Sequence, residues 1–205
     1  MKPIHIILIA VFTTMMAGNS MAVEEAKYTV SLKTEALEIR QYEAAIIAEV
    51  IVNDSFDKAS NVAFRKLFKY ISGSNSSRSE IAMTAPVKQE RRTEKIAMTA
   101  PVGQRAVEQG WAISFMMPAS YTMETIPLPV DTSIVLREIP AHHVAAIRYA
   151  GTWSENRYKQ HLVLLQTWIE QNSLEPTGQP LWARYNAPFI PWFMRRNEIL
   201  IPVAL

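Results

Sequence analysis

Residues 37–50 read LEIRQYEAAIIAEV, and residues 135–148 read VLREIPAHHVAAIR. The two stretches share a pattern at an offset of 98 residues, and each is typical of two strands joined by a short turn. Each is followed by a helical stretch whose apolar positions also match at that offset. An internal duplication is the economical interpretation, and a chance similarity between two amphipathic helices is the alternative.

Both helical stretches show the apolar spacing of a helix that covers a core. The first carries apolar residues at i, i+3, i+4 and i+7, ends at Ser72-Gly73, and leaves its basic residues on the solvent side. These positions are, in order, Phe64, Leu67, Phe68 and Ile71, with Lys58, Arg65, Lys66 and Lys69 facing solvent. The second follows GTWSEN, with Ser154 as its N-cap and its end near Asn172. Its apolar residues are Tyr158, Leu162, Leu165, Trp168 and Ile169. We therefore expect an α+β fold in which two pseudo-symmetric β-β-α-β halves place their helices on one side of a shared antiparallel sheet.

The N-terminus reads MKPIHIILIAVFTTMMAGNSMA, which has one cation, a short apolar run and small residues before Ala22. This pattern predicts a secretory signal peptide over residues 1–22, cleaved before Val23, rather than a membrane anchor, because polar residues interrupt the apolar run well short of about 20 residues. We expect a periplasmic or secreted protein, with one domain over residues 23–205 and no stable membrane insertion.

Removal of 22 of the 205 residues leaves 183, with 20 basic and 19 acidic side chains. This near-neutral balance argues against nucleic-acid binding. The chain has no cysteine, which excludes disulfides and Cys-based chemistry. It also lacks G-x-S-x-G, H-E-x-x-H and a Gly-rich phosphate loop, so we expect a binding protein and not an enzyme. We expect a monomer.

A seven-residue repeat, IAMTAPV, occurs at residues 81–87 and 96–102, separated by the charged linker KQERRTEK. The alternation suits two strands and the linker suits a hairpin loop, so we expect adjacent antiparallel strands. Pro86 and Pro101 should lie at strand ends or an edge, because proline donates no hydrogen bond to a sheet. The paired Met83 and Met98 suit strand residues better than copper ligands.

Five motifs together are specific: EIRQY at 38–42, AFRKLFKYISGSN at 63–75, the two copies of MTAPV, RYNAPF at 184–189 and RRNEILIPV at 195–203. With them the chain resembles the SOUL haem-binding protein family from about Tyr28 to Val203. The resemblance implies a distorted antiparallel β-barrel-like sheet with two helices. It also implies non-covalent binding of haem, or another tetrapyrrole or apolar small molecule, as a carrier or buffer.

Haem is a flat apolar disc with two anionic propionates and an iron atom. The resemblance places its pocket between the first helix and the sheet, at positions that here are Phe64, Phe68, Leu181 and Tyr185, with Lys69 facing a propionate; Arg65 and Lys66 are close enough to compete for that role. A core role for the aromatic residues and a solvated helix face for Lys69 are the alternatives. Relatives can carry a basic residue where this chain has Asn61, which weakens the propionate argument.

No residue is a convincing iron ligand. Some relatives carry a histidine at the position of Gln41, which does not ligate iron usefully. His142 and His143 are adjacent on a strand, and therefore point to opposite faces, so we expect one exposed and one half-buried. His161 suits a core histidine with its hydrogen bonds satisfied. These departures favour, as the alternative function, an effector-binding or partner-binding module of the same architecture without physiological haem.

Two features near the C-terminus remain open. Arg195-Arg196-Asn197-Glu198 suits an anion site or a structural role in the terminal hairpin. Trp192 and Phe193, in PFIPWFMRR at 188–196, suit either contact with a membrane or a packed corner.

Overall fold

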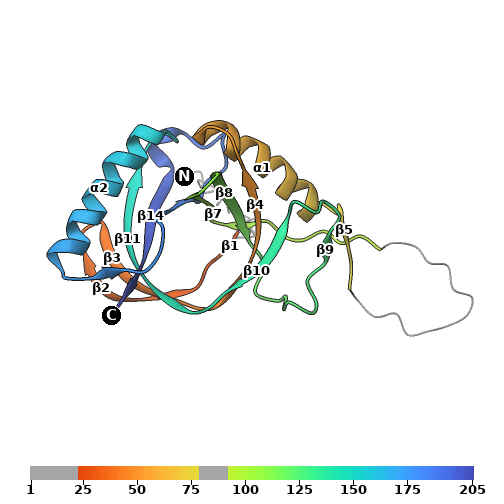
Figure 1. The fold of residues 1–205 in the computed structure, drawn as a ribbon, viewed down its shortest axis with the longest axis horizontal. Coiled ribbons are helices and arrows are strands. Elements are labelled where there is room, and N and C mark those ends of the chain that lie inside the picture. Colours follow the sequence, from red (N-terminus) through yellow and green to blue (C-terminus); the bar gives the residue numbers. More distant parts are fainter. Residues whose placement is uncertain (1–22, 79–91) are drawn as a thin grey trace, which may run out of the picture.

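A computed structural model of the chain describes residues 23–78 and 92–205. Two helices lie on the outer side of a strongly curled sheet, which has the form of a half-barrel (Figure 1). The predicted α+β class, with a barrel-like antiparallel sheet and two helices on one side of it, is confirmed.

The main sheet has ten strands, and all of its pairs are antiparallel. Its order is β10-β4-β8-β7-β13-β14-β11-β3-β2, with β12 paired to β14. The bounds are β2 Tyr28–Thr34, β3 Leu37–Tyr42, β4 Ala45–Val52, β7 Val102–Val107, β8 Gly110–Met116, β10 Val135–Ile139, β11 His142–Ala150, β12 Glu175–Pro176, β13 Leu181–Arg184 and β14 Arg196–Ala204. Two small sheets pair β1 (Glu24–Glu25) with β6 (Thr99–Ala100) and β5 (Asn75–Ser76) with β9 (Leu128–Pro129).

The strands of each repeated stretch form where the sequence predicts them, but they do not pair with each other. Strand β3 pairs with β11, and β4 pairs with β10, so each stretch pairs with the other one. A two-residue hairpin turn needs a positive φ. Neither Glu43 nor Ala44 has a positive φ, and the ring of Pro140 fixes a negative one. The chain therefore continues across the curled sheet at both places, and the duplication itself stays a prediction.

Helix α1 (Phe56–Ile71) ends at Ser72, and Gly73 follows with a φ of 118° that suits glycine. Helix α2 (Glu155–Gln171) begins after Ser154, whose side chain accepts a hydrogen bond from the Arg157 amide, and it ends at Asn172. Both helix ends and the Ser154 cap agree with the sequence prediction.

Helix α1 does not bury the face that its periodicity predicts. Leu67 and Ile71 are buried, but Phe64 and Phe68 are not. The buried side consists largely of small residues, Ala59, Ser60 and Ala63, before Leu67 and Tyr70. Small side chains let the helix lie close to β4 and β8, so the larger phenylalanines remain at its flank.

The buried apolar residues form separate clusters on the two faces of the sheet. Helix α2 packs its Leu165 and Ile169 against Ile147 and Ile199, and α1 packs against β4 and β8. A third cluster, on the concave face, contains Tyr42, Val144, Ala146, Ala183 and Leu200.

The second IAMTAPV copy contributes buried Ile96, then β6, and then β7 from Val102. Pro101 lies between these two strands, at a strand end as expected, and its peptide bond is cis. The first copy, with Met83 and Pro86, lies outside the described residues, and so does the signal peptide predicted over residues 1–22. The pairing of the two copies stays a prediction.

Candidate functional site

An aromatic pair stands on the outer flank of α1. The rings of Phe64 and Phe68 stack with centroids 6.0 Å apart and planes 9° apart. Phe64 also contacts Phe115 of β8 edge to face, at 5.2 Å. Phe64 is 36% exposed and Phe68 50% exposed. The pair is therefore anchored to the core at one end and offers flat apolar surface to solvent at the other.

These two rings form part of a depression of about 510 Å³ between α1 and the loop that precedes β10. Its lining residues are Val62, Phe64, Arg65, Lys66, Phe68, Lys69 and Asp131. Three of the five predicted site residues, Phe64, Phe68 and Lys69, therefore line one depression.

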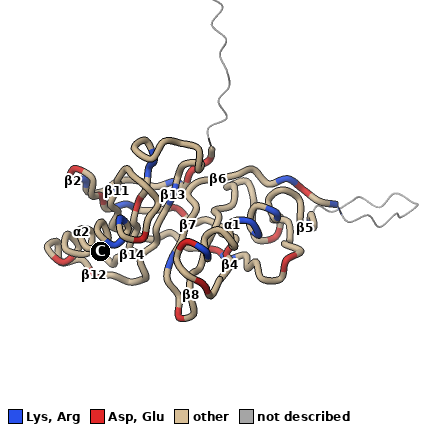
Figure 2. Tube along the Cα trace, turned by 90° about the horizontal axis from the view of Figure 1, so that it is seen from above, with Lys and Arg blue, Asp and Glu red and all other residues tan. Residues whose placement is uncertain are grey.

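The cations of the depression differ in their partners. Lys66 lies 3.8 Å from an Asp131 carboxylate oxygen and donates to the Ser133 hydroxyl at 2.8 Å. Hydrogen bonds from Ser133, with a smaller contribution from Lys66, lower the pKa of Asp131. Among the described residues, no carboxylate lies within ion-pair distance of Arg65 or Lys69. Arg65 donates from Nε to the Asn61 carbonyl at 3.3 Å, and its other two nitrogens have no hydrogen-bond acceptor among the residues that the structure describes. Figure 2 shows basic residues along α1.

The structure does not bring Leu181 and Tyr185 to this depression. Both pack with the concave-face cluster, on the side of the sheet opposite to the helices. Tyr185 donates from its hydroxyl to Glu198 at 2.9 Å, and Arg196 lies 3.7 Å above its ring. Burial, reinforced by the charge of Glu198, raises the pKa of Tyr185. Alternation along the strand decides the side: Trp182 faces α2, so Leu181 faces away from it.

On the concave face, residues of two motifs that carry the family resemblance contact each other. Arg40 of EIRQY bonds both carboxylate oxygens of Glu198 of RRNE, at 2.6 and 3.3 Å. Arg196 adds a bond to Glu198 at 2.9 Å, and Tyr42 accepts from Arg40 at 3.1 Å. Burial alone would raise the pKa of Glu198, but Arg40 and Arg196 outweigh it and lower that pKa. Arg40 and Glu198 are both buried, so these motifs tie β3 to the C-terminal strand.

No histidine lines the α1 depression. His142 and His143 are both half-buried, whereas one exposed residue was expected. The His142 ring contacts Tyr42, and its Nδ1 lies 2.8 Å from the Pro140 carbonyl oxygen. His161 stacks on Tyr149 at 3.8 Å, and its Nδ1 lies 2.7 Å from the Arg157 carbonyl oxygen. Within residues 23–78 and 92–205, no group of three or more His, Asp or Glu side chains is arranged to hold a metal.

The SOUL heme-binding protein model matches residues 23–202. The chain belongs to the SOUL heme-binding protein family. Heme-binding protein 1 of Xenopus tropicalis is 24% identical over 165 residues, which cover 80% of this chain and 82% of that protein. Heme-binding protein 1 of Xenopus laevis matches with the same identity and coverage. The C-terminal domain of EcmrR is 14% identical with a TM-score of 0.55, covering 86% of this chain and 98% of that one, and shows a likeness of fold.

The lining of the depression suits the apolar disc of haem and its anionic propionates, but it does not suit the iron atom. Two cations without an ion-paired carboxylate flank a stacked aromatic surface, but the described residues of the lining include no His, Met, Tyr or Cys. Reasoning from sequence missed Val62 and Asp131. Val62 lies beside the helical stripe, and Asp131 is a single acidic residue in a loop, so neither carried a signal that could be read before folding.

Proposed function

We propose that this chain binds haem or a related tetrapyrrole non-covalently in the α1 depression, as a carrier or buffer. The observation that carries the proposal is the half-exposed Phe64–Phe68 stack with the open cations Arg65 and Lys69 beside it. Exposed aromatic rings on a helix flank cost free energy in water, and a flat apolar ligand removes them from it. Family membership supports the class of ligand.

Each group of the depression has a role in this proposal. Phe64 and Phe68 contact the face of the macrocycle, and Arg65 and Lys69 attract the propionates. Lys66 is held by Asp131 and Ser133 and fixes the loop against the helix. A bound haem would supply the redox and ligand-binding chemistry of its iron. The residues of the α1 depression would bind and orient the disc.

The remaining parts of the proposal concern the setting. We propose that the chain binds and does not catalyse, and that it acts as a monomer in the bacterial envelope, periplasmic or secreted, after loss of residues 1–22. The leader pattern of residues 1–22 supports the location. A carrier needs reversible binding, and a lining with no iron ligand among its described residues supports an affinity of micromolar order.

A Soret titration of the purified protein with haem, beside the same titration with metal-free protoporphyrin, tests the proposal. We expect dissociation constants that agree within about threefold, since apolar contact holds either disc. Substitution of His142 or His143 by Ala should leave both titrations unchanged. Absence of binding for both ligands, or haem binding that is much tighter than porphyrin binding and is lost with one histidine, would refute it.

The lining has no iron ligand in the part of the chain that the structure describes, which favours a second candidate, a module that binds another apolar small molecule without haem. Gln41 and Asn61 support it from the sequence. Displacement of a fluorescent apolar probe from the depression by non-tetrapyrrole ligands, with no displacement by protoporphyrin, would establish this alternative.

A further inference from the structure

A second surface lies on the loop between β13 and β14, and none of its residues lines the α1 depression. Four large apolar side chains of this loop point into solvent: Phe189 is 84% exposed, Trp192 57%, Phe193 60% and Met194 64%. Trp192 and Phe193 contact each other edge to face at 5.7 Å. Single exposed apolar residues are normal on proteins, but a contiguous group marks a contact surface. The packed corner considered from the sequence is therefore wrong for these residues, which we call the apolar tip.

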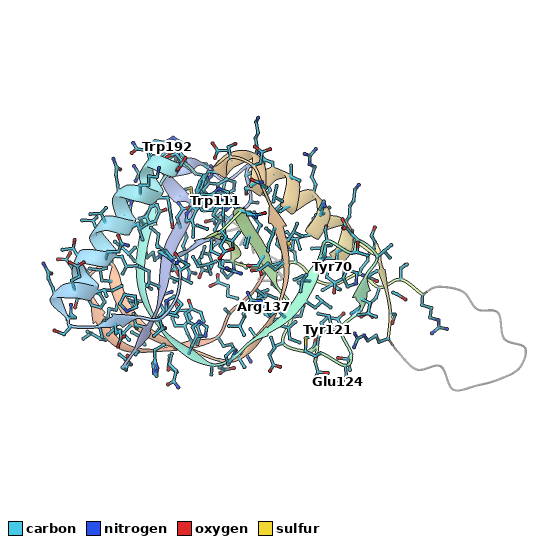
Figure 3. The ribbon with its side chains drawn as sticks, viewed as in Figure 1. Tyr70, Trp111, Tyr121, Glu124, Arg137 and Trp192 are labelled. Atoms are coloured by element: carbon cyan, nitrogen blue, oxygen red, sulfur yellow. The ribbon has the colours of Figure 1, made fainter. Side chains whose placement is uncertain are left out.

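Hydrogen bonds from Arg195 hold the loop of the apolar tip in place. Arg195 donates from Nε to the Ile190 carbonyl and from a terminal nitrogen to the Pro188 carbonyl, both at 2.7 Å. Trp192–Met194 form one turn of 3₁₀ helix. Because the loop's own carbonyls take up these donors, the tip is presented in an ordered form. Figure 3 shows Trp192 at the outer edge of the molecule, on the side where α1 and α2 begin.

Three arginines lie at the base of the tip. Met194 lines a depression of about 330 Å³ together with Arg148, Arg195 and Arg196. Arg196 is neutralised by Glu25 at 2.8 Å and by Glu198 at 2.9 Å. Within the described ranges, Arg148 and Arg195 have no carboxylate within ion-pair distance.

Two more arginines lie in this region, and one of them, Arg184, also interacts with the charge of Asp57. Arg157 donates to the Ala150 carbonyl at 2.8 Å, and Arg184 donates to the Ser60 hydroxyl at 2.6 Å. The guanidinium groups of Arg184 and Arg195 both lie over the Trp153 ring, at 5.6 and 4.4 Å. Arg148, Arg157 and Arg195 therefore carry positive charge near the base of the tip with no ion-paired carboxylate among the described residues, in a chain whose total charge is almost balanced.

We propose that this surface docks the protein peripherally on a bilayer that contains anionic phospholipid. The apolar tip enters the boundary between headgroups and acyl chains, where tryptophan and phenylalanine are favoured. Arg148, which is exposed at the base of the tip, then lies at headgroup level and receives a lipid phosphate, and Arg195 adds positive charge beside it. The positive charge at the base of the tip complements anionic phospholipid headgroups, and this charge complementarity favours a lipid surface over an apolar groove of a protein partner. Neither helix of the described chain is both long and apolar enough to cross a membrane, and the proposed docking needs no crossing.

Quenching of tryptophan fluorescence by brominated phosphatidylglycerol vesicles tests this, because it reports on residues that enter the bilayer. Trp192 is the most exposed tryptophan among the described residues. W192F in the full chain should therefore remove most of the quenching. The double variant F189S/F193S, which keeps Trp192 as the reporter, should weaken partitioning by more than about tenfold. Arg148→Ser should weaken it by about fivefold, without touching the bonds that hold the loop.

Matched controls come from elsewhere on the surface. Leu164 on α2 is 57% exposed, as Trp192 is, and Lys95 is an exposed cation next to the C-terminal end of α1. Leu164→Ser and Lys95→Ser should leave partitioning unchanged. Vesicles of brominated phosphatidylcholine alone should give little quenching. Equal quenching by the two lipids, no quenching by either, or equal losses in the control variants would overturn the proposal.

Discussion

Truncation of Phe68 tests whether apolar contact or charge holds the ligand in the α1 depression. A phenylalanine side chain buries about 200 Å² when fully covered, and Phe68 is 50% exposed, so about 100 Å² remains for a ligand. A planar ligand that covers half of this area gains about 1.3 kcal/mol, close to tenfold in the dissociation constant. Phe68→Ala should therefore weaken protoporphyrin binding about tenfold.

Lys69→Ala should have a smaller effect. Lys69 is exposed, and an exposed charge pair contributes only about 0–1 kcal/mol, which is at most about fivefold. Both variants should be titrated with protoporphyrin at low and at physiological salt. Any loss caused by Lys69→Ala should shrink as salt rises, whereas the loss caused by Phe68→Ala should not.

Leu164→Ala on α2 is the matched control, because Leu164 has similar exposure but lies outside the depression. Its titration should be the same as that of the unaltered chain. The reasoning is refuted if Lys69→Ala weakens binding more than Phe68→Ala does, or if Leu164→Ala weakens it as much.

Arg40→Met should destabilise the fold by about 3–5 kcal/mol in urea denaturation, because it removes one partner of the buried Glu198 carboxylate; a loss below about 1 kcal/mol would show that Arg196 alone suffices. The lowered pKa of Glu198 contributes stability that is complete above its ordinary pKa of 4.5 and is lost as pH falls through the folded-state value. Urea midpoints measured from pH 6 down to pH 3 should therefore fall, and less steeply for Glu198→Gln. His161→Ala should leave the Soret band of the haem complex unchanged, and its disappearance would identify an axial ligand. Intact mass of the exported protein should place the N-terminus at Val23, and a retained leader would contradict both cleavage and export.

Much of the local structure follows from the sequence. Alternating and β-branched residues define β3, β4 and β11, the Ser154 cap begins α2, and Ser72-Gly73 ends α1, because these signals act over a few neighbouring residues. The family motifs also carried the ligand class, and the position of Phe64, Phe68 and Lys69 on one helix was enough to place them together.

Only the tertiary structure shows which strands pair and which surfaces the helices cover. Periodicity gives the side of a helix but not how close the helix lies to the sheet, so the exposure of Phe64 and Phe68 depended on Ala59 and Ala63 packing tightly. Alternation along a strand separates its two faces but does not say which face a helix covers. The sequence therefore could not show that Leu181 and Tyr185 lie on the concave face, away from α1. Arg40 and Glu198 are 158 residues apart, and their pairing required β3 and β14 to flank the same strand, β11. Exposure, pairing of distant charges and the choice of face are properties of the whole packed molecule, because each depends on which surfaces the other elements have already covered.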